Sequence, residues 1–148
     1  MLEQSGKVVN PELLEERLVS RMPTIYLAGP FFSASQRWLV NTFREALLDL
    51  GADVRSPFHD VGLGTPHEVA LADLEHLSAA HGVLAILDGL DPGTLFEVGY
   101  ARACGIPVVG FASQSDDKNL TMTIGARIPV YQDLTTAVYQ AIWTAASV

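Results

Sequence analysis

The spacing of apolar residues changes repeatedly along the chain and predicts alternating strands and helices. Short, mostly apolar segments that end at Gly, Pro or Asp are typical of strands covered on both faces of a sheet. Between them, apolar residues recur every three or four positions, the period of a helix with one buried face. The predicted strands cover residues 24–29, 52–57, 83–88, 106–111 and 128–131. The predicted helices lie within residues 33–51, 66–80, 94–104, 117–125 and 134–145.

Regular alternation of strands and helices predicts an α/β domain built on a parallel sheet. Because crossover connections are right-handed, we expect a doubly wound five-stranded parallel sheet of the flavodoxin-like or Rossmann-like kind, in the order 2-1-3-4-5 and flanked by helices. Ligands of such sheets bind beyond the carboxyl ends of the strands, where the strand order reverses. Here that point lies between the loops at 29–35 and 88–94. Residues 1–22 are expected to form a helical extension to the domain at 23–148.

The composition fits a globular protein whose ligand is small and mostly uncharged. The 148 residues are 49 % hydrophobic and 18 % charged, which provides enough apolar surface for one core. Nine basic residues against 17 acidic ones give a net charge of −8, which argues against a nucleic-acid polymer as partner. No apolar stretch is long enough to cross a membrane, so no membrane partner is expected. The single cysteine, Cys104, excludes an internal disulfide and fits the reducing cytosol, so we expect a cytoplasmic protein.

One acidic residue, Glu97, falls inside the mostly apolar segment LDGLDPGTLFEVGYARACGIPVV at 87–109. Thr94 and Glu97 have the spacing of a capping box, in which a Thr N-cap and a Glu three residues later satisfy each other's backbone donors. A carboxylate in the first helical turn is also kept ionised by the helix N-terminus, even when partly buried. At a ligand crevice such a carboxylate is a good nucleophile for an electrophilic carbon. The spacing alone leaves both roles open.

A second acidic residue, Asp73, falls on the apolar side of a predicted helix. It shares one stripe with Val69, Ala70, Leu77 and Ala80 by their three- and four-residue spacings. An acid in such a place either has a polar partner or has a raised pKa and works as a proton donor. The alternatives are an Asp at the edge of the buried face or one that caps a neighbouring loop.

Further candidates lie in and near the two loops at the switch point. Asp88 and Asp91 are natural turn residues. Phe31 and Phe32 form either a hydrophobic plug or a stacking surface for a flat ligand. Tyr26, in the first predicted strand, is typical of a core residue whose hydroxyl is bonded to a neighbour.

Several other site types do not fit the sequence. There is no G-x-x-x-x-G-K-[ST] motif and therefore no P-loop. The four histidines lack H-E-x-x-H or Cys-paired spacing, so no metal is expected. A phospho-receiver domain needs acids after the first strand, where this chain has Gly29-Pro30-Phe31.

The sequence resembles the nucleoside 2-deoxyribosyltransferase family over residues 24 to about 131. The resemblance is carried by IYLAGPFF at 25–32, ADLEHL at 72–77, DPGTLFEVGYARACGIPVV at 91–109 and NLTM at 119–122. The third block is the most specific, because an Asp, a Gly-rich turn and a Glu six residues after that Asp are a rare combination. The resemblance implies an enzyme that transfers 2-deoxyribose between nucleobases, with nucleosides and free nucleobases as small-molecule partners and no cofactor.

The resemblance also implies roles for three residues in catalysis. Glu97 would attack the anomeric carbon of a 2′-deoxynucleoside and form a covalent deoxyribosyl-enzyme. An acceptor base would then release the sugar with overall retention, as in retaining glycosidases. Asp73 would protonate the departing base and deprotonate the incoming one, and Tyr26 would hold Glu97 in place through its hydroxyl.

Other residues would bind the substrate. Asp91 would accept hydrogen bonds from sugar hydroxyls, and Phe31 would pack on the base. Asn119 would reach a neighbouring subunit's site, which implies a homo-oligomer, either a dimer or a trimer of dimers. The loop at 56–64 would recognise the nucleobase, with Phe58 and His59 as the candidate contacts. The remaining candidate contacts are Gly29, Phe32, Gly93 and Thr94.

The main alternative is hydrolysis of the N-glycosidic bond of (deoxy)nucleosides or their 5′-monophosphates. N-hydrolases of the same superfamily use the same glutamate but pass the sugar to water, and they tend to carry a serine at the position of Asp91. A carboxylate there would repel a phosphate. In favour of a phosphate site are the donors Ser33, Ser35, Arg37 and Thr94.

A second alternative is a non-catalytic nucleoside-sensing module. Such a module would be expected to lack at least one of Tyr26, Asp73 and Glu97. All three are present, which favours an enzyme.

Overall fold

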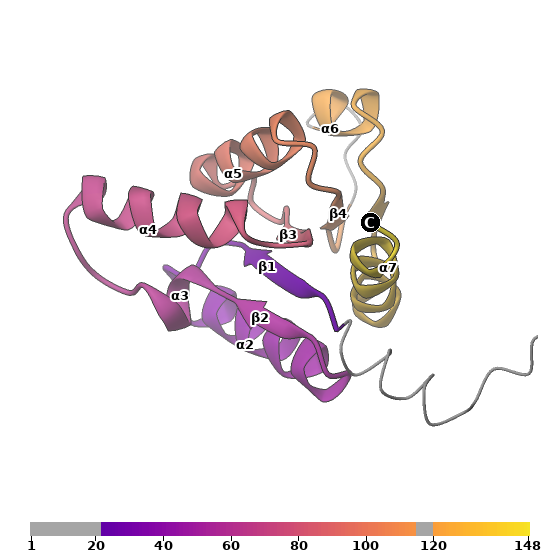
Figure 1. The fold of residues 1–148 in the computed structure, drawn as a ribbon, viewed down its shortest axis with the longest axis horizontal. Coiled ribbons are helices and arrows are strands. Elements are labelled where there is room, and N and C mark those ends of the chain that lie inside the picture. Colours follow the sequence, from indigo (N-terminus) through magenta and orange to yellow (C-terminus); the bar gives the residue numbers. More distant parts are fainter. Residues whose placement is uncertain (1–21, 115–119) are drawn as a thin grey trace, which may run out of the picture.

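A five-stranded parallel sheet forms the centre of the protein (Figure 1). The computed structural model describes residues 22–114 and 120–148, so residues 1–21 of the predicted extension and Asn119 lie outside the described residues. The strand bounds are Thr24–Ala28 (β1), Asp53–Arg55 (β2), Gly82–Ile86 (β3), Val108–Phe111 (β4) and Val130–Tyr131 (β5). Their order is β2-β1-β3-β4-β5 and every neighbouring pair is parallel, which confirms the predicted fold class.

Helices cover both faces of this sheet. Their bounds are Ala34–Asp49 (α2), Pro57–Asp60 (α3), Pro66–Ser78 (α4), Pro92–Ala103 (α5), Thr121–Gly125 (α6) and Leu134–Ala146 (α7). On one face, Phe43 of α2 and Val138 of α7 pack in the same core. On the other, α4 and α5 lie side by side and contribute Leu77 and Ala101 to a second core (Figure 1). Within the described residues, no helix has the length and apolar character needed to span a bilayer.

The alternation of side chains along β1 decides where Tyr26 points. Ile25 and Leu27 enter the core beneath α2 and α7. Successive side chains of a strand point to opposite faces, so Tyr26 faces α4 and α5, in the core that also contains Val98 of α5. The Tyr26 side chain is fully buried, with an exposed fraction of 0 %. The sheet therefore fixes the position of its hydroxyl beneath α5.

The start of α5 differs from the prediction. Asp91 is the N-cap, its carboxylate accepts a hydrogen bond from the backbone N–H of Thr94 over 2.8 Å, and Pro92 occupies the first turn. The predicted capping box of Thr94 and Glu97 is wrong, because Pro92 suits the first helical position and lets the helix begin two residues earlier. A capping box does form at α4, between Thr65 and Glu68.

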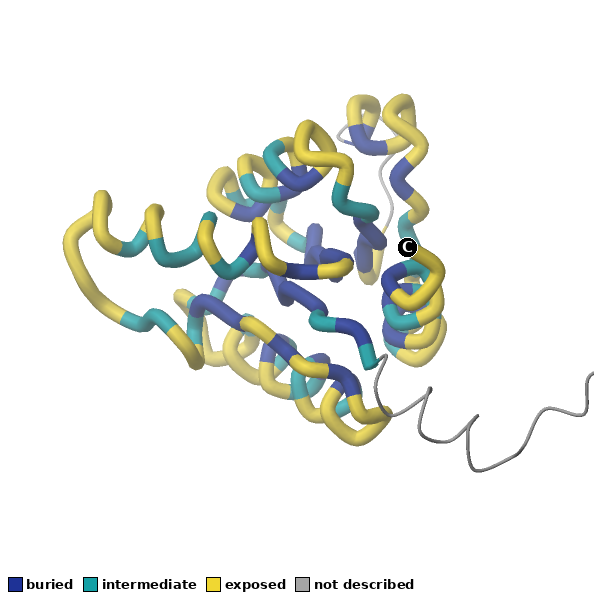
Figure 2. The backbone as a smooth tube through the Cα atoms, in the orientation of Figure 1, coloured by how far each residue is buried: buried dark blue, intermediate teal, exposed yellow. Residues whose placement is uncertain are grey.

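The predicted apolar stripe on α4 is only partly correct. Leu77 is buried within the helix, and Ala80 is buried just beyond its end. Val69 is half-buried and Ala70 is exposed. The first half of α4 thus stands clear of the sheet, and Figure 2 shows it almost without buried residues. Proximity to the core increases toward the end of α4, where the chain turns into β3.

The segment at 56–64, expected to be a loop, contains the short helix α3. Ser56 is its N-cap, and the backbone N–H of Ser56 donates to the carboxylate of Asp60 over 2.6 Å. The remaining strands and helices begin or end within a few residues of the predicted bounds; the predicted helix at 117–125 is described only from Leu120 onward.

Candidate active site

A cavity of about 300 Å³ opens between the end of β1, α3, α4 and the start of α5. It brings together eight of the residues singled out in the sequence, namely Gly29, Phe31, Phe32, Asp73, Asp91, Gly93, Thr94 and Glu97. Three carboxylates, Asp73, Asp91 and Glu97, therefore share one small cavity. No basic side chain lines it among the described residues, so it suits a neutral, hydrogen-bonding ligand.

Tyr26 lies directly behind this cavity and contacts Glu97. The Tyr26 hydroxyl donates a hydrogen bond to Glu97 Oε1 over 2.7 Å. Burial, the Glu97 carboxylate and the hydrogen bond to it all raise the pKa of Tyr26 far above its ordinary value. Tyr26 thus keeps its proton and orients one oxygen of Glu97, which leaves the other oxygen free.

Glu97 itself is poised between two protonation states. Burial raises its pKa to about 7, the hydrogen bond from Tyr26 opposes that rise, and the charges of Asp73 and Asp91 add to it. The expectation that the helix N-terminus keeps Glu97 ionised is therefore wrong. Glu97 lies beyond the first turn, which contains no acidic residue, and desolvation outweighs the helix dipole.

Asp73 faces the same cavity from α4. Burial raises the pKa of its carboxyl group, and the nearby His76 opposes that rise. Of the two possibilities that the sequence left open, a polar partner or a raised pKa, the second agrees with this direction. Its Oδ1 atom is buried without a hydrogen-bond partner. A carboxyl group whose pKa is above its ordinary value and that borders a ligand cavity has the properties of a general acid.

Asp91 has a structural role as well as a position in the cavity. One of its oxygens, Oδ2, accepts hydrogen bonds from the backbone N–H and the hydroxyl of Thr94, over 2.8 and 3.0 Å. Gly93 lies close to the same oxygen, since a Cβ added there would be 3.2 Å away from it, which is a tight contact. The Asp91 carboxylate is therefore held in one orientation at the rim of the cavity, with Oδ1 available to a ligand.

Aromatic residues build one wall of the cavity. The ring of Phe31 stacks on Phe32 and on Phe58, with centroid distances of 5.5 and 5.2 Å. Phe58 does not line the cavity and instead supports Phe31 from behind. His59 does not line it either, because its ring nitrogens contact Ser56 Oγ at 3.0 Å and Asn41 Oδ1 at 2.7 Å.

Sequence reasoning missed several lining residues. Pro30, Pro57, Gly62, Leu63, Gly64 and Val69 complete the wall. Four of them belong to the segment 56–64, which was predicted to contact the nucleobase. Phe58 and His59 were the predicted contacts within this segment, and neither of them lines the cavity. The two glycines were the available signal, since Gly62 has a positive φ of 71° and brings the backbone itself to the cavity.

Comparison with known proteins identifies the family. The model of the nucleoside 2-deoxyribosyltransferase family matches residues 25–129. The chain belongs to this family. The resemblance seen in the sequence blocks is thereby confirmed, and the family and fold support an enzyme that acts on N-glycosidic bonds. No match to the chain was found among curated proteins.

Solved structures of related proteins share the fold. A 2-deoxyribosyltransferase from Bacillus psychrosaccharolyticus is 30 % identical, with a TM-score of 0.69 over 82 % of this chain and 95 % of that chain. One from Leishmania mexicana is 23 % identical, with a TM-score of 0.56 over 67 % and 71 % of the two chains. The CMP N-glycosidase BcmB of Clostridium botulinum is 17 % identical, with a TM-score of 0.60 over 79 % and 95 %. The last two likenesses show the fold alone.

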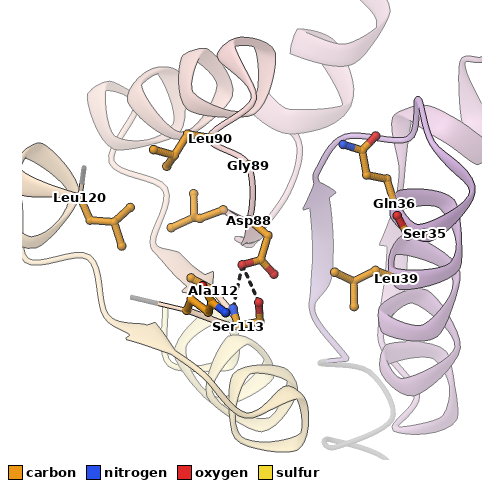
Figure 3. Close-up of a pocket in the computed structure, with 11 residues that line it drawn as sticks. Ser35, Gln36, Leu39, Asp88, Gly89, Leu90, Ala112, Ser113 and Leu120 are labelled. Carbon is orange, nitrogen blue, oxygen red and sulfur yellow. Dashed lines mark hydrogen bonds between the residues drawn. The ribbon is translucent and has the colours of Figure 1, made fainter. Parts of the chain in front are cut away.

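A larger cavity, of about 650 Å³, is lined by the start of α2, the loop after β3 and the residues after β4 (Figure 3). Among its described lining residues Asp88 is the single charged one, and Asp88 Oδ1 accepts hydrogen bonds from the backbone N–H and hydroxyl of Ser113, over 2.8 and 3.0 Å. The described lining of this cavity thus offers one carboxylate, whereas the cavity of about 300 Å³ brings three together. The smaller cavity is therefore the candidate active site.

The donors considered for a phosphate site have other partners. Arg37 Nη1 donates to the carbonyl of Phe32 over 3.1 Å, and the Thr94 hydroxyl donates to Asp91. Ser33 caps α2 and contacts Ser35. Of these four donors only Thr94 lines the cavity of about 300 Å³. Within the described residues no three His, Cys, Asp or Glu side chains are placed so that together they could hold a metal ion.

Proposed function

We propose that this protein transfers 2-deoxyribose between nucleobases through a covalent deoxyribosyl-enzyme on Glu97, with overall retention. The observation that carries the proposal is the 2.7 Å contact from Tyr26 to Glu97, with Asp73 facing the same cavity. The contact fixes one Glu97 oxygen and leaves the other facing the ligand. Membership of the nucleoside 2-deoxyribosyltransferase family supports the same substrate class.

The first half-reaction begins with the free oxygen of Glu97. It attacks the anomeric carbon of a 2′-deoxynucleoside, and the electron pair of the broken C–N bond goes to the base. Asp73 gives its proton to that base nitrogen, so neutral base departs and Asp73 becomes a carboxylate. Tyr26 keeps its own proton throughout, since its pKa is strongly raised, and stabilises the ionised form of Glu97.

The second half-reaction reverses these roles. A nitrogen of the acceptor base attacks the same carbon and gives its proton to Asp73. The bond from carbon to Glu97 breaks and its electron pair returns to the carboxylate. Each step inverts the carbon, so the product has the original configuration.

The rest of the cavity supplies binding. Asp91 Oδ1 accepts hydrogen bonds from sugar hydroxyls, and Phe31, supported by Phe58, packs on the base. Backbone at Gly62 and Gly64 borders the base. We further propose a homo-oligomer in which Asn119 reaches a neighbouring site. Phe32 and Leu63 line the cavity and are exposed, with 73 % and 101 % of their surface accessible. Such exposure is consistent with a second subunit that covers the opening of the cavity.

Chromatography of product mixtures tests the proposal. Deoxyinosine plus adenine should give deoxyadenosine and hypoxanthine, and deoxyadenosine should form only when adenine is present. Glu97→Gln should lower the rate by about 10³-fold or more, as loss of a nucleophile does in other enzymes. Glu75→Gln, an exposed acid on α4, serves as the matched control and should leave the rate unchanged.

The other outcomes separate the alternatives. Free base without acceptor, lost in Glu97→Gln, would show an N-glycosidase, and cleavage confined to 5′-monophosphates would show a nucleotide hydrolase. Mass spectrometry of acid-quenched enzyme should detect deoxyribose on the peptide that contains Glu97. A panel of nucleosides and monophosphates that all stay intact would favour the sensing module.

A further inference from the structure

Two buried polar atoms without hydrogen-bond partners lie one helical turn apart on α4. They are Oδ1 of Asp73 and Nδ1 of His76. The described residues contain one other such side-chain atom, Nε of Arg44. A buried polar atom without a partner costs about 1–3 kcal/mol, and native proteins contain few of them. Two on one helix face, one of them on the proposed general acid, call for a shared explanation.

Helix geometry brings these two side chains together. Residues three apart in a helix are neighbours on one face. Because side chains lean toward the helix N-terminus, the imidazole of His76 lies over the turn that carries Asp73. A rotation about either side chain, or one bridging water, would pair both unsatisfied atoms at once.

We propose that His76 is a positioning residue for Asp73: its imidazole stabilises the carboxylate that forms when Asp73 gives its proton to the departing base. The inference rests on the proposed function, since it assigns His76 a part in the same proton transfer. His76 does not line the cavity and so touches no reacting atom. Its effect is to make Asp73 a readier donor and to hold the carboxylate until the acceptor base returns the proton.

The other charged groups around Asp73 disfavour its carboxylate form, which makes the opposing effect of His76 significant. Glu97 and Asp91 of α5 line the same cavity and repel a second or third negative charge there. Tyr26 of β1 faces Asp73 as a neutral phenol. From α5, Tyr100 lies beside the end of α4, with its hydroxyl 3.4 Å from Ser78 Oγ, and adds no charge. Among these groups His76 alone opposes the rise in the pKa of Asp73.

The decisive measurement is an NMR titration of the Asp73 carboxyl group, which requires no catalysis. The protein is labelled with ¹³C at its Asp carboxyl carbons. The titration is done in the Glu97→Gln background, which removes the neighbouring carboxylate of Glu97. The Asp73→Asn variant identifies the signal of Asp73. His76→Gln should move the Asp73 midpoint to higher pH, because the imidazole that opposes the rise in the pKa of Asp73 is gone. His67→Gln, the same substitution at an exposed position of α4, should not move it. An unchanged midpoint in His76→Gln would overturn the inference.

Two further variants separate charge from folding. His76→Lys places a positive charge at this position and should return the midpoint toward that of the parent. His76→Asn should repeat the effect of His76→Gln if the latter does not fold. A midpoint in His76→Lys as high as in His76→Gln would contradict an electrostatic effect of this side chain on Asp73.

Kinetics connects the titration to the reaction. In otherwise unmodified enzyme, His76→Gln should lower kcat by roughly tenfold with KM unchanged, part of the 10²–10⁴-fold that a general acid contributes. A rise in KM with kcat unchanged would instead indicate a substrate-binding role. If the parent enzyme converts no substrate, the proposed function fails, while the titration still decides whether His76 acts on Asp73.

Discussion

The hydroxyl of Tyr26 lies 2.7 Å from Oε1 of Glu97, although the two residues are 71 positions apart in the sequence. Tyr26 belongs to β1, which lies between β2 and β3 in the sheet, and Glu97 belongs to the second turn of α5. The contact joins a group that cannot ionise near neutral pH to one whose pKa is about 7. Four predictions follow from this contact and its surroundings.

Removal of the Tyr26 hydroxyl should shift the pH dependence of activity. Tyr26→Phe deletes a hydrogen bond to the ionised form of Glu97, a bond worth about 1.5–3 kcal/mol. The pKa of Glu97 should rise by roughly one unit or more, so the acidic limb of kcat/KM moves to higher pH. Tyr139→Phe removes a hydroxyl from an exposed tyrosine on α7 and should leave the profile unchanged. An acidic limb at the same pH in Tyr26→Phe would show that the contact does not tune Glu97.

Glu97 should make the protein less stable as the pH rises. Its pKa is about 7 in the folded protein against an ordinary value of 4.5, so folding favours the protonated form. This contribution is complete below about pH 4.5 and is lost as the pH rises to 7 and beyond, by about 3 kcal/mol in total. Glu97→Gln should therefore be more stable than the parent at pH 8 and nearly equal to it at pH 4.5. Urea unfolding of both proteins across this range measures the difference, and a gap that stays constant with pH would contradict the prediction.

Asp91 should affect two separate properties, the stability of the protein and the pKa of Glu97. Asn is as good an N-cap as Asp, so Asp91→Asn should keep α5 stable, whereas Asp91→Ala should lose about 1 kcal/mol. Both variants remove a charge that raises the pKa of Glu97, so both should move the acidic limb of activity to lower pH. Asp133 caps α7 with the same contacts to Thr136, and Asp133→Ala should cost similar stability without moving the limb. Equal stability of Asp91→Ala and Asp91→Asn would disprove the capping role.

The aromatic wall should bind the base rather than act in the chemical step. Phe31→Ala removes the lining ring and should raise KM with kcat nearly kept, since the contact is the same in ground and transition states. Phe58→Ala leaves the lining ring in place but removes its support, worth about 0.5–1.5 kcal/mol, and should have a smaller effect in the same direction. Trp38→Ala, on the exposed face of α2, is the control for loss of a large aromatic side chain. A fall in kcat in Phe31→Ala at constant KM would argue against this assignment.

The position of α5 shows where local rules suffice and where they compete. The sequence DPGTLFE at 91–97 contains two start signals, a Thr–Glu capping box and an Asp–Pro start, and the periodic pattern is compatible with both. The structure uses the Asp–Pro start, with Asp91 bonded to Thr94. Glu97 is thereby moved out of the first turn, and its ionisation is governed by burial instead of by the helix N-terminus.

Helix α4 shows the same limit on a larger scale. A stripe of apolar residues predicts a buried face but does not say how far along the helix the neighbouring core extends. Leu77 reaches the core, whereas Ala70 and Leu71 do not. The space left beneath the first half of α4 becomes part of the cavity, and Val69 and Asp73 line it.

The sequence by itself determined the parallel α/β fold, the strand order and eight of the residues that line the candidate site, because hydrophobic periodicity and short motifs are local properties of the chain. Asp73 and Glu97 stood out by their apolar surroundings, and Tyr26 through the resemblance to the family. The tertiary structure decided which atoms meet and how strongly each acid holds its proton. Those properties depend on distances between residues far apart in the sequence and on the exclusion of water, neither of which is set until β1, α4 and α5 pack together.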